Sequence, residues 1–181
     1  MKDLNLKQTL TILKDFTTKK YGATDFIYYN KKEHSLVATD KFRLVRIELS
    51  DDINIADEDS FIDVNKQFDN YDIKTSKTIE GFKIETAEKC ELYYPEVNRL
   101  LRRDLTKYNG DLELQDLILN IGVEMRKHIL VGYSDCYKKL SKIYLNQVEV
   151  YAEDDSPFMI EGWMRNLRNC KFKILVMPLN I

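Results

Sequence analysis

The stretch that most constrains the fold is residues 36–49, which read Leu-Val-Ala-Thr-Asp-Lys-Phe-Arg-Leu-Val-Arg-Ile-Glu-Leu and predict two strands around a tight turn. A strand directs alternate side chains to one face, and the positions that fit this period of two are Leu36 and Ala38, then Leu44, Arg46 and Glu48. Thr39, Asp40 and Lys41 form the polar break. The Asp40 carboxylate can accept hydrogen bonds from turn amides, so we expect it to shape the turn.

The first segment, residues 5–18, has the spacing of an amphipathic helix. Asn5 followed by Gln8 fits a capping box, and Leu6, Leu10 and Leu13 form one apolar stripe. A second, polar stripe at the same spacing consists of Lys7, Thr11, Lys14 and Thr18, and it is extended by Lys19 and Lys20. Such a lysine stripe is ordinarily a solvated helix face.

The remainder of the first half is rich in predicted strands. Strands are expected at 25–30, at 61–64, at 79–86 and at 92–94, with a short helix at 65–73. Residues 51–59 hold five acidic side chains and no basic one, which indicates a surface loop. Residues 1–94 thus predict a helix, several strands, a second helix and further strands.

The second half repeats this outline. The apolar spacing within residues 95–110, bounded by Pro95 and Gly110, favours a helix. Strands are predicted at 112–120 and 123–131, a helix at 134–145, and closing strands at 148–152, 158–161 and 172–179. The chain is therefore expected to belong to the α+β class.

Composition limits the kinds of protein that the chain can be. With 181 residues and 44% hydrophobic side chains, it can form one domain or two small ones around a real core. A net charge of −2 argues against a protein that wraps nucleic acid over its whole surface. The basic residues, however, concentrate on predicted helices and the acidic ones in loops. No apolar run is long enough to span a membrane, so we expect a soluble cytoplasmic protein.

No catalytic or cofactor site is evident in the sequence. Cys90, Cys136 and Cys170 are widely spaced, which makes a zinc site improbable and favours reduced thiols. Ser134 beside Cys136 is better explained as a helix cap than as a nucleophile. A glycine-rich phosphate loop is absent, and the acidic stretches at 51–59 and 153–155 lack the spacing of a calcium loop. We therefore expect no enzymatic activity, no cofactor and no metal.

Three motifs, taken together and in order, point to a known family. They are Ala38-Thr39-Asp40-x-x-Arg43-Leu44, then Tyr94-Pro95-Glu96-Val97-Asn98-Arg99, and finally Val176-Met177-Pro178-Leu179 at the chain end. They resemble Ala-Thr-Asp-Gly-His-Arg-Leu, Phe-Pro-Asp-Tyr-Arg-Arg and Val-Met-Pro-Met-Arg-Leu of the bacterial DNA sliding clamp, the β subunit of replicative DNA polymerase III. That family has three domains, and its first has no counterpart here.

The resemblance implies a DNA-clamp (processivity-factor) fold with two clamp-like domains. Residues 1–94 resemble the middle domain of the family, and residues 95–181 resemble its C-terminal domain in a shortened form. In the family, the segment that matches residues 96–108 is an extended linker, so helix and linker both remain open there. The implied function is to encircle double-stranded DNA and to dock DNA polymerase and the clamp loader through short linear peptides.

The resemblance also implies two sets of site residues. The peptide pocket would consist of Thr39, Lys41, Phe42, Arg43, Leu44, Pro95, Arg99, Leu100, Pro157, Leu175, Met177, Pro178 and Leu179. The DNA-facing set would consist of Lys7, Lys14, Lys19, Lys20, Lys66, Arg103, Lys138, Lys139 and Lys142. Lys41-Phe42 departs from the Gly-His of the family, so Phe42 could narrow the pocket or change its preference.

Oligomeric state and function each retain alternatives. Two domains per chain favour a homotrimeric ring of six domain-equivalents, although a tetramer or a ring that needs a partner also fits. A shortened clamp of this type would suit a phage or a mobile element. The other functions that fit are a clamp-like module that binds replication proteins without forming a ring, and an unrelated α+β enzyme. The pocket residues could equally be ordinary core and edge-strand positions.

Overall fold

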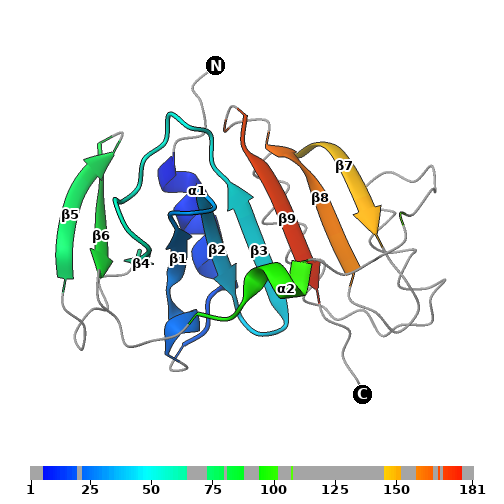
Figure 1. Cartoon of the computed structure of the whole chain (residues 1–181), viewed down its shortest axis with the longest axis horizontal. Helices are drawn as coiled ribbons and strands as arrows, with labels where there is room; N and C mark the ends of the chain where they lie inside the picture. The colour runs from blue at the N-terminus through cyan, green and yellow to red at the C-terminus, as the bar shows by residue number, and fades with distance from the viewer. Residues whose placement is uncertain are drawn as a thin grey trace.

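The computed structural model of the chain describes residues 6–19, 22–64, 73–79, 81–87, 94–101, 107, 145–151, 158–164, 167 and 169–176. Within this part, the strands form one antiparallel sheet of nine strands in the order β5-β6-β4-β1-β2-β3-β9-β8-β7. Figure 1 shows helix α1 behind this sheet and helix α2 in front of it. We call the two sides the α1 face and the α2 face.

The first half of the chain supplies the larger part of the sheet. Its elements are α1 (Leu6–Leu13), the 3-10 turns η1 (Lys14–Phe16) and η2 (Ala23–Asp25), and the strands β1 (Ile27–Asn30), β2 (Ser35–Thr39), β3 (Arg43–Glu48), β4 (Ser60–Asp63), β5 (Ile73–Ile79) and β6 (Phe82–Ala87). The remaining elements are α2 (Val97–Leu101), β7 (Leu145–Tyr151), β8 (Phe158–Met164) and β9 (Lys171–Val176).

Helix α1 packs on the sheet through the predicted apolar stripe. Leu6, Leu10 and Leu13 are all buried in the core on the α1 face. Regular helix ends earlier than the predicted residue 18, because Thr17 has extended backbone and its hydroxyl donates to the Lys14 carbonyl at 2.8 Å. The helix therefore covers the sheet with about two turns followed by η1. Asn5, the predicted cap, lies outside the described residues.

The predicted hairpin is present as β2 and β3. The register pairs Thr39 with Leu44, and the Asp40 carboxylate accepts hydrogen bonds from the amides of Phe42 (3.1 Å) and Arg43 (2.7 Å). Lys41 has a φ of 77°, a left-handed conformation that this short turn requires. The prediction that Asp40 shapes the turn is therefore confirmed.

We expect Asp40→Ala to destabilise the folded protein by about 1–3 kcal/mol, because two turn amides and the Arg43 guanidinium lose their acceptor. Urea unfolding followed by circular dichroism measures the change. Asp51→Ala, at an exposed position of the acidic loop, is the matched control and should change the free energy of unfolding by less than about 0.5 kcal/mol. Equal stability of the two variants would contradict this account of the turn.

Both faces of the central strands are buried. Every residue of β2 is buried, since alternate side chains enter two separate cores. The core on the α1 face takes Leu36, Ala38, Val45 and Ile47, together with Phe172 and Ile174 of β9. The core on the α2 face takes Val37 and Leu44, together with Leu175, Met159 and the apolar residues of α2.

Strands β3 and β9 join the two halves of the chain. They pair antiparallel from Arg43 opposite Val176 to Glu48 opposite Lys171. Strand β8 continues the sheet on the far side of β9, and β7 follows it. The sheet thus runs without a break through residues assigned to both predicted domains, and the division at residues 94 and 95 stays a prediction.

Several predicted elements differ from the structure. The strand predicted at 79–86 is present as β6, but it begins only at Phe82, because β5 ends at Ile79 and Gly81 takes a φ of 74° in the turn between the two strands. The turn at Gly81 was hidden between two strands of similar composition. Ile73 belongs to β5 and Leu145 to β7, whereas helices were predicted to end there. The remainder of those helices, residues 65–72 and 134–144, lies outside the described residues, as do the strands predicted at 112–120 and 123–131.

The segment after Pro95 contains a helix, as its spacing favours. Helix α2 covers Val97–Leu101, and its residues Val97 and Leu101 are buried. It does not reach Gly110 as a continuous helix, because Lys107 forms an isolated β-bridge with Tyr151.

Residues 51–59 form a loop as predicted, and the side chain of Ile55 within this loop is buried. In the described part of the chain, no helix is long and apolar enough to cross a membrane.

Candidate peptide-binding site

An apolar cluster of the α2 face includes residues at which β3 and β9 pair. Leu44 and Leu175 are directly opposite each other in the register, and both side chains are almost fully buried. Helix α2 lies over them, and the half-buried Leu100 packs against the same cluster. The structure thus brings together three of the predicted pocket residues, Leu44, Leu100 and Leu175, which we call the apolar floor.

The tip of the β2–β3 hairpin forms one border of this region. Thr39 is occupied with the turn, since its hydroxyl donates to the Arg43 carbonyl at 2.8 Å and accepts from the Lys41 amide at 3.1 Å. Phe42 is 55% exposed, which is unusual for so large an apolar side chain. Lys41 is also exposed. Of the predicted hairpin residues, Lys41 and Phe42 are therefore the exposed ones.

Arg43 points to the opposite side of the sheet from Leu44, because neighbouring residues of a strand alternate between faces. Its guanidinium pairs with Asp40 at 2.6 Å and lies 5.0 Å from the centre of the Phe16 ring on the α1 face. It also donates to the Asp15 carbonyl at 3.3 Å. The structure therefore does not bring Arg43 to the apolar floor, where the sequence placed it.

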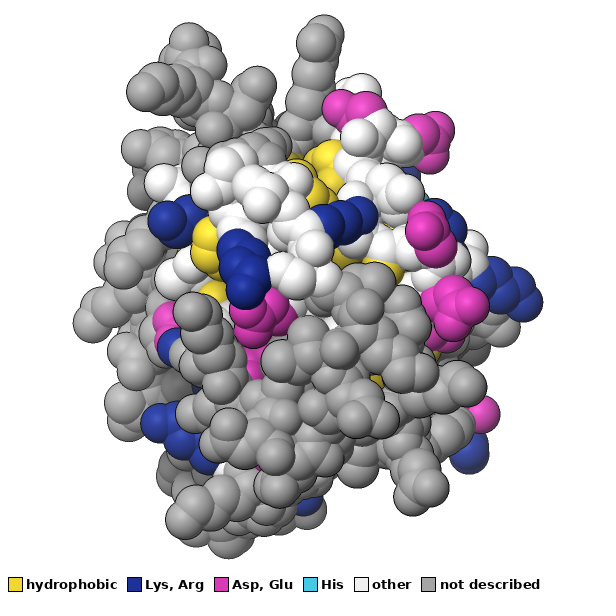
Figure 2. Space-filling view, turned by 90° about the vertical axis from the view of Figure 1, so that its left-hand side faces the viewer, with side chains coloured by type: hydrophobic (Ala, Val, Ile, Leu, Met, Phe, Trp, Pro, Cys, Tyr) yellow, Lys and Arg dark blue, Asp and Glu magenta, His cyan; other side chains and the backbone are white. Residues whose placement is uncertain are grey.

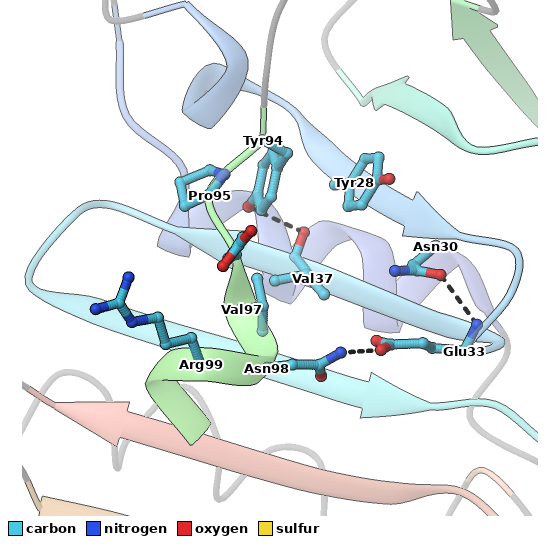
Figure 3. A pocket seen from close by; sticks show the side chains of 10 residues that line it. Tyr28, Asn30, Glu33, Val37, Tyr94, Pro95, Val97, Asn98 and Arg99 are labelled. Carbon is cyan, nitrogen blue, oxygen red and sulfur yellow. Dashed lines mark hydrogen bonds between the residues drawn. The ribbon is translucent and has the colours of Figure 1, made fainter. Parts of the chain in front are cut away.

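An open groove lies beside the segment that leads into α2. One side consists of Tyr28, Asn30 and Glu33 with Val37, the other of residues 94–99, and the volume between them is about 710 Å³. Figure 3 shows Tyr28 and Glu33 on one side of this segment and the Arg99 guanidinium on the other. Pro95 and Arg99, both predicted pocket residues, are exposed along its rim.

Two stacked tyrosines form the upper part of this groove. The rings of Tyr28 and Tyr94 are 4.7 Å apart at an angle of 15°, and the Tyr94 hydroxyl donates to the Val37 carbonyl. Burial is the largest cause that raises the pKa of both phenols above its ordinary value. Sequence reasoning missed these residues. The aromatic pair in β1 and the tyrosine before Pro95 were visible, but nothing indicated that they would meet.

A polar network fixes α2 to the sheet below the groove. Arg46 of β3 donates to the Asn98 side chain at 2.8 Å and pairs with Glu33 and Glu48, each at 3.5 Å. The Asn98 amide in turn donates to the Glu33 carboxylate. Because these groups come from β1–β2, β3 and α2, the network holds the groove and the apolar floor in a fixed relation.

The described part of the predicted DNA-facing set lies at the α1 side. Lys7 and Lys19 are exposed and Lys14 is half-buried, and the Lys7 ammonium lies 5.4 Å from the centre of the Phe82 ring. Figure 2 views the molecule from the β5 side, where several acidic side chains lie toward the right-hand edge, others lie beside basic ones left of the middle, and basic side chains are spread over the face. The residues of the two predicted sets that lie outside the described part are Lys20, Lys66, Arg103, Lys138, Lys139, Lys142, Pro157, Met177, Pro178 and Leu179.

Titratable side chains do not gather into a metal site in the described ranges. No group of three or more His, Cys, Asp or Glu side chains among those residues is placed to hold an ion. Cys170 is buried, and burial raises the pKa of its thiol, which keeps the thiol protonated.

Comparison with known proteins gives a likeness of structure only. No family model matches the sequence, and no curated protein matches it either. Among solved structures, the DNA polymerase sliding clamp from Pseudomonas aeruginosa matches with a TM-score of 0.56 at 14% identity, over 97% of this chain and 65% of that chain. The same clamp with a ligand matches with a TM-score of 0.57 at 14% identity, over 97% and 64%.

The chain thus spans about 65% of the length of the clamp chains that it matches. At 14% identity the likeness concerns the fold and not the activity. The fold predicted from the three motifs is confirmed: this chain has an α+β DNA-clamp fold.

Proposed function

We propose that this chain is a DNA sliding clamp, a processivity factor that encircles duplex DNA and docks replication proteins through a peptide pocket. The observation that carries the proposal is the likeness to sliding-clamp structures over 97% of the chain. The three sequence motifs add to it, because two of them meet in space: Leu44 of the first and Leu100, just after the second, share one apolar cluster. In this proposal the chain acts by binding and not by catalysis.

The pocket proposal rests on the apolar floor and its surroundings. A docking peptide would place apolar side chains against Leu100 and Phe42, above Leu44 and Leu175. Such pockets concentrate affinity in a few well-packed contacts. The network of Arg46, Asn98 and Glu33 holds α2 in place before a peptide arrives, which reduces the entropy lost on binding.

The ring proposal rests on the open sheet. Strand β5 is the outermost strand on one side of the sheet in the described part of the chain. An uncovered strand edge is a template for pairing with another chain, so proteins usually cover it. Head-to-tail pairing of identical chains closes into a ring when the rotation allows it. With two clamp-like domains per chain, a homotrimer supplies six.

We expect the protein to sediment as a trimer at micromolar concentration, and dilution should dissociate it into monomers without an intermediate species of other size. Sedimentation velocity over a concentration series measures this. A tetramer would retain the ring and change its stoichiometry. A monomer at high micromolar concentration would rule out the self-assembled ring and favour the second function, a clamp-like module that binds replication proteins without encircling DNA.

A further inference from the structure

The groove beside residues 94–99 has a chemistry different from that of the apolar floor. Its volume of about 710 Å³ is large enough for one or more side chains of a bound peptide. The walls combine an aromatic ring, Tyr28, with two carboxylates, Glu33 and Glu96. Neither Tyr28 nor Glu33 nor Glu96 belongs to the pocket that the sequence predicted.

The Tyr28 ring is held in a fixed orientation. It stacks on Tyr94 at 4.7 Å and contacts the Phe61 ring at a centroid distance of 5.4 Å. Its hydroxyl donates to the Asp59 carboxylate at 2.8 Å. The Tyr94 ring covers one face of Tyr28, and Tyr28 also lines the groove, where a guanidinium group can contact the ring and pair with a carboxylate at the same time.

The charges around the ring favour a cation. The pKa of the Tyr28 phenol is raised, first by burial and then by the carboxylates of Asp59 and Glu33. These two carboxylates place negative potential at the Tyr28 hydroxyl. Arg46 balances Glu33 from below, at 3.5 Å. The Arg99 guanidinium, the basic group of the groove lining, points to the other side of the segment in Figure 3. Among the lining residues, the side of Tyr28 thus carries the Glu33 carboxylate, and the basic Arg99 lies on the other side of the segment.

We propose that the Tyr28 end of the groove binds an arginine side chain of the peptide whose apolar residues occupy the floor. The guanidinium would stack on Tyr28 and pair with Glu96 or Glu33. This inference rests on the proposed peptide-docking function and adds the identity of a flanking residue to it. Arginine suits the site better than lysine, because its planar group can stack and pair simultaneously.

The test uses the full chain and a set of fluorescent peptides with one apolar docking motif, in which arginine or glutamine occupies each flanking position in turn. At one position, arginine should improve affinity by about fivefold over glutamine. The advantage should fall below about twofold in Glu96→Gln and in Tyr28→Leu, which remove the carboxylate and the ring respectively. Glu149→Gln, the same charge change on β7, is the matched control and should keep the full advantage.

The outcomes separate this inference from the pocket proposal. If the peptides bind but arginine gives no advantage at any position, or if the advantage survives in both groove variants, the arginine site is overturned and the pocket stands. If no peptide binds, the pocket proposal fails, and acetyl-arginine amide then tests the groove directly by NMR. It should shift the ring resonances of Tyr28 and Tyr94 at millimolar concentration, and less so in Glu96→Gln. No shift, or an equal shift with acetyl-glutamine amide, overturns the inference.

Discussion

Replacing Lys7, Lys14 and Lys19 together by glutamate should lower the affinity for duplex DNA by about 100-fold or more at low salt. The three lysines lie on or just after α1, away from the leucines that pack on the sheet. In the proposed ring each of them would recur in every protomer, so each substitution would remove several phosphate contacts at once. Each lost contact should also reduce the slope of log affinity against log salt by about 0.9. Fluorescence anisotropy with a labelled duplex, over a salt series, measures both quantities.

Two controls make this result specific. Lys31→Glu and Lys173→Glu change charge in the same sense on other parts of the surface, beside the acidic loop and on β9 respectively. Both should bind DNA within about threefold of the parent, since neither belongs to the α1 side. Circular dichroism should show that the triple variant remains folded. If the folded triple variant binds DNA like the parent at low salt, the α1 side does not face DNA.

The sequence predicted the elements whose periodicity was strong. The leucine stripe of α1 and the alternating hairpin of β2 and β3 are present because each has an unbroken apolar period that only one packing satisfies. The role of Asp40 was also predictable, since a turn aspartate acts on amides two and three residues away. Local patterns of this kind do not depend on the remainder of the chain.

Features that depend on pairing between distant residues were not predictable in the same way. The position of Glu33 under Asn98 is set by the passage of α2 across the sheet, which brings residues 65 positions apart into contact. The direction of Arg43 was in principle available, because alternation from Leu44 requires it to face α1. It was assigned to the pocket by motif alone. A motif match therefore needs the strand period beside it before a side chain is given a role.

Leu100→Asp should weaken the binding of an apolar docking peptide by about 10-fold to 100-fold. Leu100 is the half-buried member of the apolar floor, so a carboxylate there remains partly solvated in the free protein but would be desolvated beneath a bound peptide. Leu44 and Leu175 are less suitable, because truncating such buried side chains costs about 2–5 kcal/mol of stability and would confuse folding with binding. Anisotropy titration with a labelled peptide that carries two or more large apolar side chains measures the loss.

Arg43→Ala provides the contrast that separates geometry from motif. Because the Arg43 guanidinium lies against Phe16 and Asp40 on the α1 face, this variant should lose stability without losing peptide affinity in the protein that remains folded. Phe42→Ala should behave in the opposite way, since the ring is 55% exposed in the β2–β3 turn, two residues before Leu44 of the floor. If the docking site lies on the α2 face, the loss of peptide affinity should be largest for Leu100→Asp, smaller for Phe42→Ala and smallest for Arg43→Ala. If Arg43→Ala instead causes the largest loss at unchanged stability, the peptide binds at the hairpin from the α1 side, and the apolar floor is only core.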